Sequence, residues 1–157
     1  MEEKIKEFEK VRKEVGGVIK VFPEVSRDKI LFDRWSLKDI VEHLSNWMVH
    51  DIECLDSLES GVEPHWEPSF DEFNKRGVEE RSVWTWEEVV EEYEKLNKDL
   101  IETYKSLRQD LWNKPIWKGY GLTARKFFQN DIEHQREHLK DLENKLRKYL
   151  LSDTVTQ

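Results

Sequence analysis

Residues 61–84 read GVEPHWEPSFDEFNKRGVEERSVW, and they decide how the rest of the chain is arranged. This stretch separates two amphipathic segments and is much longer than the usual connection between neighbouring helices. Short loops join antiparallel helices, whereas a long crossover allows two successive helices to run parallel. We expect a short helix within the crossover, at residues 70–78. The length of the stretch therefore favours a helical bundle with one long crossover.

Two helices are expected before the crossover, because apolar residues recur there at intervals of three and four. The first covers about residues 2–22, and Pro23 ends it. The second begins at Ser36, whose hydroxyl can cap the helix while Asp39 follows three residues later. Gly61 lies just beyond its end.

Two further helices are expected after the crossover. The third follows Thr85, which forms a capping box with Glu88, and its apolar pattern continues to Leu111. The fourth covers about residues 123–151, with an apolar stripe that includes Leu150 and a frayed end at residues 152–157. We therefore predict an all-α fold, a four-helix bundle with a long crossover between helices 2 and 3, forming a single domain over residues 1–157.

Composition excludes several classes of protein. The 157 residues carry a net charge of −8, with 38% charged and 37% hydrophobic residues. An acidic balance argues against nucleic acid as a partner, because binding phosphate needs a concentrated basic face. Cys54 is the only cysteine, which excludes an internal disulfide and favours a reducing compartment. The sequence also lacks a secretory signal and an apolar run that could span a membrane, so we expect a cytoplasmic protein.

The histidines suggest a metal site. His134 and His138 lie four residues apart on the expected fourth helix, so that their rings stack and can converge on one ion. Such a pair on a solvent-facing side of a helix usually has no function. His43 lies beside the apolar stripe of the second helix, at the same offset as the pair on the fourth. The hypothesis is therefore a three-histidine metal site made of His43, His134 and His138, although spacing alone does not bring the two helices together.

Three motifs resemble one known family. Residues 35–44 read WSLKDIVEHL, in which a Trp, a small capping residue and a basic–acidic pair precede a histidine. Residues 134–139 read HQREHL and contain H-x-x-x-H. The crossover contains Phe73-Asn74 followed by Val78 and Arg81. In order and spacing, over most of the chain, these motifs resemble the DinB/YfiT-like metalloenzymes, a superfamily related to thiol-dependent S-transferases and to the N-domains of maleylpyruvate isomerases.

The resemblance implies an up-down-down-up bundle and a divalent metal ion (zinc, nickel, manganese or iron) held by three histidines with coordination positions left open. It also implies a thiol-dependent S-transferase or isomerase that acts on a small molecule, with a low-molecular-weight thiol such as mycothiol, bacillithiol or glutathione as cosubstrate. The alternative is a non-catalytic protein that binds or sequesters a small molecule on the same bundle. A vestigial site in an interaction protein is a third reading. We expect neither nucleic acid nor a membrane as partner, and a homodimer stays open.

Several other residues have two readings. His50 is either an outer-shell partner or fourth ligand of the metal, or a partly exposed helix histidine. Cys54 is best explained as a small buried hydrophobe, since it lies too far along the helix from His43 to share its site. Asp131 either orients a ligand imidazole or is an ordinary carboxylate near a helix start.

The tryptophans also have two readings. Trp47 lies four residues after His43 and either lines a substrate pocket or only packs. Trp66 and Trp117 fall in expected loops, together with others near helix ends. These indoles either close the ends of the bundle or form the mouth of an apolar pocket.

Overall fold

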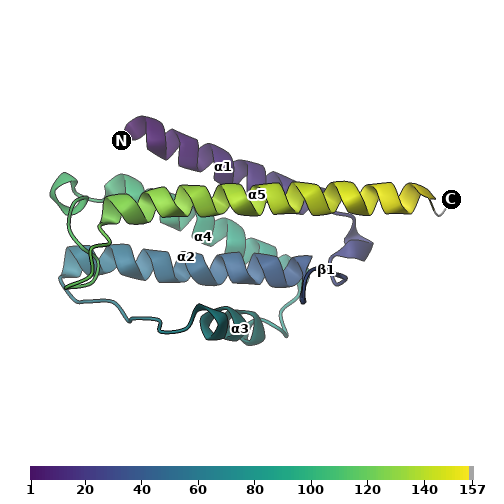
Figure 1. Cartoon of the computed structure of the whole chain (residues 1–157), viewed down its shortest axis with the longest axis horizontal. Coiled ribbons are helices and arrows are strands. Elements are labelled where there is room, and N and C mark those ends of the chain that lie inside the picture. The colour runs from purple at the N-terminus through teal and green to yellow at the C-terminus, as the bar shows by residue number, and fades with distance from the viewer. Residues whose placement is uncertain (156–157) are drawn as a thin grey trace. The chain divides into compact units, whose positions relative to one another are not determined.

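The computed structural model describes residues 1–155, which are mostly helical (Figure 1). Five α-helices lie in this part of the chain: α1 (Glu2–Val21), α2 (Leu37–Ser60), α3 (Phe70–Glu80), α4 (Trp86–Ser106) and α5 (Ala124–Val155). Two short 3-10 helices, η1 (Glu24–Ser26) and η2 (Gln109–Leu111), and two short strands, β1 (Ile30–Phe32) and β2 (Trp35–Ser36), complete the order. The prediction of a helical class is confirmed.

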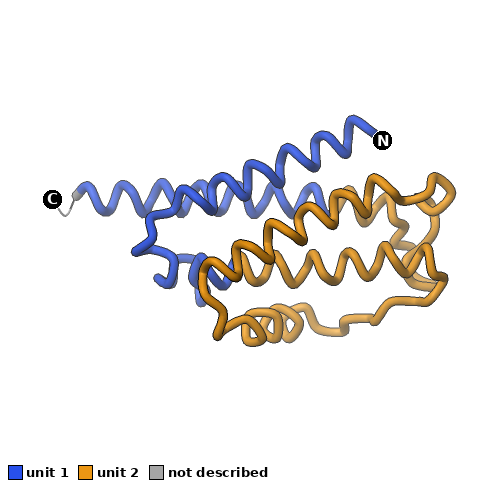
Figure 2. Tube along the Cα trace, turned by 180° about the vertical axis from the view of Figure 1, so that it is seen from behind, with its two compact units in different colours: residues 1–40, 131–157 blue, residues 41–130 orange. Residues whose placement is uncertain are grey.

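The chain divides into two compact units, which Figure 2 colours separately. Unit 1 comprises residues 1–40 and the chain from Asp131 onward, and unit 2 comprises residues 41–130. Helices α2 and α5 each contribute residues to both units. The four-helix bundle and the single domain stay predictions.

Unit 1 contains α1 and most of α5, which run in the same direction (Figures 1 and 2). Side chains far apart in the sequence join them. The guanidinium of Arg12, 1% exposed, donates to the Asp131 carboxylate at 3.2 Å. Arg136 also pairs with Glu7. Removing one partner of a buried ion pair leaves the other charge buried and uncompensated, so the Arg12–Asp131 pair fixes how α1 lies against α5.

The start of α2 also lies in unit 1 and is capped as the sequence predicts. The backbone N–H of Asp39 donates to Ser36 Oγ at 3.2 Å, and the N–H of Ser36 donates to Asp39 Oδ2 at 2.8 Å. These reciprocal bonds satisfy two backbone donors near the helix start, where no partner exists within the helix. The first turn of α2 is therefore fixed locally.

The two strands that precede α2 were not predicted. They form an antiparallel hairpin with Ile30 opposite Ser36 and Phe32 opposite Trp35. Asp33 lies between them with a φ of 57°, in the left-handed region that Asp tolerates better than most residues. Strands of three and two residues are too short for an alternating pattern to be recognised in the sequence.

Unit 2 contains α2, α3 and α4, and here the crossover prediction is confirmed. The predicted short helix at residues 70–78 is α3, which Ser69 caps by accepting a bond from the N–H of Glu72. Because the crossover carries the chain back along the unit, α2 and α4 run in the same direction (Figure 2). The predicted Thr85–Glu88 capping box opens α4, with both of its hydrogen bonds present.

Helix α3 is held tightly against α2. A Cβ atom added at Gly77 would lie 2.7 Å or less from the Cβ and Cγ atoms of Asn46, so the two helices approach more closely than a larger residue would allow. Asn46 Nδ2 donates to the carbonyl of Phe73 at 3.3 Å, and Trp47 Nε1 donates to Asn74 Oδ1 at 2.8 Å. Two side-chain hydrogen bonds and one glycine therefore set the position of α3.

Arg81 joins α3 to α4 in the same unit. Its guanidinium makes two bonds to the Glu92 carboxylate, of 2.7 and 3.2 Å, and a third of 3.1 Å to the carbonyl of Gly77. A bidentate pair of this kind fixes direction as well as distance. The crossover is thus a defined structural element rather than a loose loop.

Two helix ends differ from the prediction. Helix α4 ends at Ser106, because Leu107 has φ −60° and ψ 122° and the chain then turns through η2. Leu107 and Leu111 are buried beyond the end of α4, with Leu111 in η2, which explains why the apolar pattern continued past the end of the α-helix. Helix α5 reaches Val155 instead of ending near residue 151, so residues 152–155 are helical rather than frayed. Residues 156 and 157 lie outside the described residues.

The buried stripe of α5 also differs from the prediction near its end. Leu150, expected in the stripe, is exposed, and Tyr149 is buried in its place. The hydroxyl of Tyr149 accepts a bond from Lys29 Nζ at 3.2 Å.

Candidate metal centre

The three histidines that the sequence singled out form one group. A ring nitrogen from each of His43, His134 and His138 lies within 4.8 Å of the others. His134 and His138 belong to unit 1 and His43 belongs to unit 2. This group could hold a metal ion.

The α5 pair has the geometry that its spacing predicts. The two Nε2 atoms of His134 and His138 lie 3.0 Å apart, with ring centroids separated by 4.4 Å and planes inclined at 61°. Two nitrogens bound to one tetrahedral zinc at about 2.05 Å would lie about 3.3 Å apart. The two nitrogens therefore lie nearly as close as they would around one ion, at a distance that also allows one ring to donate a hydrogen bond to the other. Both side chains are partly buried.

His43 comes from the second turn of α2. Its side chain is almost fully buried, at 5% exposed. The Ser36–Asp39 cap fixes the helix start one to two turns before it, so the backbone that carries His43 is anchored locally. A buried imidazole on a capped helix is held more rigidly than one on a loop.

The donor set fits a divalent transition metal. Imidazole nitrogen suits zinc, nickel and iron, and three neutral donors leave at least one position of a tetrahedral ion for an outside ligand. The group contains no carboxylate, so its three ligands would add no charge to that of the ion.

Asp131 accepts a bond from Arg12, three residues before His134. It is 8% exposed and lies well inside α5, which begins at Ala124, so it is not a carboxylate of the first helical turn. Its contact with Arg12 holds the segment of α5 that carries the histidine pair. The sequence did not indicate this partner, because Arg12 lies 119 residues away.

His50 does not belong to the three-histidine group. Its Nδ1 atom lies 3.3 Å from Asp51 Oδ1, and its ring packs edge-on against Trp47 and Phe73. The sulfur of Cys54 lies 3.7 and 3.8 Å from the two ring nitrogens of His50. The structure thus places His50 in an aromatic and polar environment on α2.

Cys54 is fully buried, as the sequence predicted. Burial raises the pKa of its thiol far above the ordinary value, and the negative charges of Asp51 and Glu53 raise it further. The thiolate is the reactive form of cysteine, so the thiol of Cys54 is an inert packing group in the folded protein.

Among the described residues, side chains of unit 2 line at least two hollows. One, about 110 Å³ in volume, is lined mainly by aromatic side chains and includes Trp47, Trp66 and Trp117. From the sequence, Trp47 either packs or lines a substrate pocket, and Trp66 and Trp117 either close the bundle ends or form a pocket mouth. The structure brings the three together. Their positions span the crossover and the loop before α5, so no local pattern could have joined them.

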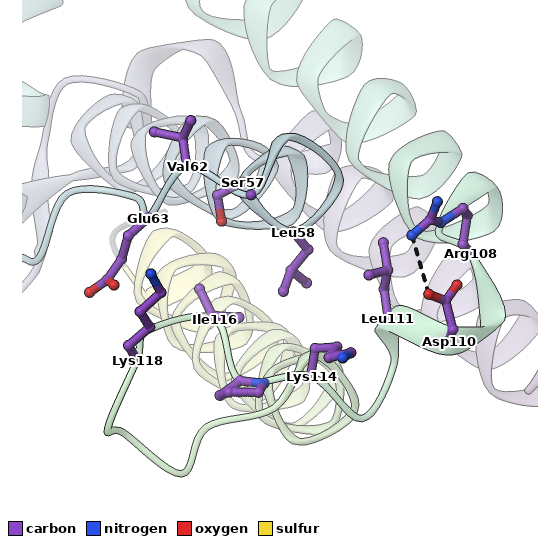
Figure 3. A pocket seen from close by; sticks show the side chains of 12 residues that line it. Ser57, Leu58, Val62, Glu63, Arg108, Asp110, Leu111, Lys114, Ile116 and Lys118 are labelled. Carbon is purple, nitrogen blue, oxygen red and sulfur yellow. Dashed lines mark hydrogen bonds and ion pairs between the residues drawn. The ribbon is translucent and has the colours of Figure 1, made fainter.

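The other hollow is larger, about 400 Å³, and Figure 3 shows its lining. Lys114 and Lys118 line it together with the acidic Glu63 and Asp110. Arg108 also lines it but is paired with Asp110 at 3.2 Å (Figure 3). It also pairs with Glu59 at 3.6 Å. Because the lining carries both positive and negative charges, and Arg108 is already paired, this hollow shows no clear preference for one kind of ligand.

Comparisons with protein families, with curated proteins and with solved structures found no match to this chain. No helix within the described residues is long and apolar enough to cross a lipid bilayer.

Proposed function

We propose that this chain is a divalent-metal-dependent enzyme that transfers or isomerises a small molecule with the help of a low-molecular-weight thiol. The observation that carries the proposal is the group of three imidazole nitrogens from His43, His134 and His138. Structural metal sites are usually closed by four protein ligands, whereas catalytic sites have three and leave a position open. A three-histidine set belongs to the second kind.

The nucleophile is expected to come from a cosubstrate, because the chain offers no reactive thiol of its own. Cys54 is its single cysteine, and that thiol is buried with a raised pKa. A bound divalent metal would lower the pKa of a coordinated thiol or water and so supply a nucleophile at neutral pH. In the transfer, the thiol gives its proton to the solvent and its sulfur forms a bond to an electrophilic carbon. The leaving group departs with the electrons of the bond that breaks.

The protein's own part in this chemistry is to hold three imidazoles in place. On α5, the Arg12–Asp131 pair anchors the turn that precedes His134. On α2, the Ser36–Asp39 bonds anchor the turns that precede His43. Sites carried by helices with fixed ends are positioned more precisely than sites on loops.

We further propose that the helices form the up-down-down-up four-helix bundle of the DinB/YfiT-like metalloenzymes. The parallel course of α2 and α4 within unit 2 supports this, as does the capped segment of residues 35–44, in which His43 follows the Ser36–Asp39 cap. We also propose that the protein acts in the cytoplasm and that its substrate is a small molecule.

The first experiment is elemental analysis of untagged protein, followed by loading with zinc, nickel, manganese or iron. The loaded protein is then screened for conjugation of mycothiol, bacillithiol, glutathione or coenzyme A to a panel of electrophiles. We expect turnover with the metal-loaded protein, and we expect it to be lost in the chelated protein and in His43→Ala.

Cobalt-substituted protein separates the alternatives. A thiol that changes the cobalt spectrum and turns over supports the transferase. A thiol that changes the spectrum without any turnover would favour the sequestration protein instead. If none of the four thiols changes the spectrum, the thiol-dependent proposal is wrong.

A further inference from the structure

Unit 2 contains a hollow whose walls are unusually rich in aromatic rings. Six of the nine residues that line it are Trp, Phe or Tyr, and these are Trp47, Trp66, Phe70, Trp117, Tyr120 and Phe127. We call this hollow the aromatic pocket. The other three lining residues are His50, Glu67 and Leu122. The lining contains no lysine or arginine.

The rings meet at steep angles, so they form walls around a space rather than a flat stack. The planes of Trp66 and Trp117 are inclined at 88°, with centroids 5.2 Å apart. Trp66 meets Tyr120 at 70° and 5.1 Å, and Trp47 meets Phe70 at 79° and 5.4 Å. Each ring in such an arrangement turns a face or an edge toward the space between them.

The hydrogen-bond donors of the two inner tryptophans are already used by the protein. Trp47 Nε1 donates to Asn74 Oδ1 at 2.8 Å, and Trp117 Nε1 donates to the carbonyl of Pro64 at 3.1 Å. What these indoles present to a ligand is therefore ring surface rather than N–H groups. The pocket suits a ligand group that needs no hydrogen bonds.

The pocket has a rigid floor and an open mouth. Trp117 is buried in a small cluster with Cys54 and Ile116, which fixes the floor. Trp66 is 49% exposed and Tyr120 is 51% exposed, so the rim is in contact with solvent. A floor that exists before binding lowers the entropy cost of taking up a ligand.

We propose that the aromatic pocket binds a quaternary ammonium group. Cations are attracted to the faces of Trp and Tyr rings, and cages of such rings are the usual protein site for choline and for methylated lysine. A quaternary ammonium has no N–H to satisfy, which suits a lining made mostly of ring surface. A primary ammonium would need about three acceptors, and the lining supplies few.

Charge and size support the same class of ligand. Glu67 is the one acidic residue of the lining, and its side chain is 11% exposed. Its two oxygens each lie 3.0 Å from Arg76 Nη2, so the arginine offsets part of the negative charge. The volume of about 110 Å³ is smaller than the 150 Å³ or so of an engineered cavity that binds benzene, and it fits a compact head group.

None of the three proposed metal ligands lines the aromatic pocket. His50, which lines the pocket, lies seven residues after His43 on α2, or about 10 Å along the helix axis. Binding of the ammonium should therefore need no metal. Failure of the metal proposal and failure of this one can be told apart by using chelated protein.

The test uses the full-length, metal-free protein with choline and tetramethylammonium. The neutral comparison compound is 3,3-dimethylbutanol, in which carbon replaces the charged nitrogen of choline. We expect saturable 1:1 binding of both cations by calorimetry, and an affinity for choline at least about fivefold higher than for the neutral compound. The indole N–H signals of Trp47 and Trp117 should shift in NMR spectra on titration. Equal affinity for the charged and neutral compounds, or no binding of either cation, would overturn the proposal.

Variants assign the binding to the pocket. Trp66→Ala and Tyr120→Ala remove half-exposed rings and should each weaken choline binding by about three- to thirtyfold. Trp86→Ala removes a ring of the same unit that does not line the pocket, and it should leave the affinity unchanged. Thermal melts of each variant show whether the fold is retained. Unchanged affinity in both folded pocket variants would contradict the assignment.

Glu67 and Arg76 carry opposite charges, so substituting each should change choline affinity in opposite directions. Glu67→Gln should weaken choline binding about two- to threefold, whereas Arg76→Gln should strengthen it by removing a positive charge that opposes the ligand. Both variants should leave binding of 3,3-dimethylbutanol unchanged. A loss of choline affinity in both variants would mean that Glu67 acts only through its bond to Arg76, and the proposed role of its charge would be wrong.

One further arm separates two sources of the ligand. Vesicles of phosphatidylcholine present the same head group at a surface, and sedimentation with them is compared with binding of free choline. Binding of free choline without sedimentation identifies a soluble ligand, and sedimentation that Trp66→Ala abolishes identifies a lipid surface.

Discussion

His134 and His138 on α5 have the same helical spacing as His50 and Cys54 on α2, and the structure treats the two pairs differently. His134 and His138 on α5 bring their Nε2 atoms to 3.0 Å, and a third imidazole, that of His43, completes a group within 4.8 Å. His50 and Cys54 on α2 also lie four residues apart, with the sulfur 3.7 Å from the nearer ring nitrogen.

The surroundings of the two pairs explain the difference. The α2 pair is covered by aromatic rings from α3 and by buried apolar groups, and its thiol is held in the protonated form. The α5 pair is partly exposed. A neutral imidazole binds a metal without losing a proton, whereas a thiol must first be deprotonated. Two side chains four residues apart therefore form a candidate metal site only where a third donor lies nearby and where burial does not hold a ligand in its protonated form.

The largest expected effect is on metal affinity. His134→Ala or His138→Ala should weaken binding of zinc or nickel at least about a hundredfold, since even the outer partners of metal ligands change affinity ten- to a hundredfold. His50→Ala removes the equivalent histidine of the α2 pair and should change the affinity less than about twofold. Competition against a coloured chelator measures both. Full metal affinity in both α5 variants would show that His134 and His138 do not bind the metal.

The second prediction concerns the helix that covers the α2 pair. Gly77→Ala should lower the free energy of unfolding by about 1–2 kcal/mol, because the new methyl group collides with Asn46, and any gain in helix propensity is smaller. Displaced α3 should also expose Cys54, so that a thiol reagent labels it faster, while metal affinity stays the same.

Gly17→Ala is the matched control for this variant. Gly17 lies within α1, and a Cβ added there meets nothing within 4 Å. It should raise the free energy of unfolding by about 0.5–1 kcal/mol. If both substitutions stabilise the protein, α3 does not lie as tightly on α2 as the structure indicates.

The third prediction uses the raised pKa of Cys54. The folded protein retains the thiol proton to a higher pH than the unfolded chain does, so this group contributes stability that is fully present below the unfolded pKa and is lost as pH rises. Between about pH 8.5 and 9.5 the free energy of unfolding should fall by about 1 kcal/mol, and at higher pH the slope should approach about 1.4 kcal/mol per pH unit. Urea unfolding at several pH values measures the slope.

Cys54→Ala provides the comparison for that slope. It should be less stable at neutral pH because a small cavity replaces the sulfur, but its stability should be nearly independent of pH over the same interval. An identical slope in both proteins would show that other groups cause the alkaline loss.

The smallest effect is expected in helix content when metal is removed. The apolar cores of the units do not depend on three ligands, unlike the core of a small zinc finger. Circular dichroism after chelation should show nearly the same helical signal and a cooperative melt, with only a lower Tm. A random-coil spectrum would mean that the α5 pair and His43 are structural ligands.

Prediction from the sequence was most successful where the cause is local. The Thr85–Glu88 capping box, the Ser36–Asp39 cap and the short helix at residues 70–78 each depend on residues within one or two turns. The spacing of His134 and His138 likewise fixes their mutual geometry, because a helix places residues four apart on one face. These features follow from the backbone and need no contact with the rest of the molecule.

Other features depend on residues far apart in the chain, and only the tertiary structure decided them. The partner of Asp131 is Arg12, Gly77 is needed because Asn46 packs against it, and the walls of the aromatic pocket extend from Trp47 to Phe127. A periodic pattern shows which residues are buried, but it does not show what they are buried against. The sequence by itself therefore determined the helices, their caps and the three histidines as candidate ligands. The packing of Cys54 against Ile116 and Trp117, and the convergence of six aromatic side chains, were decided by packing between distant segments.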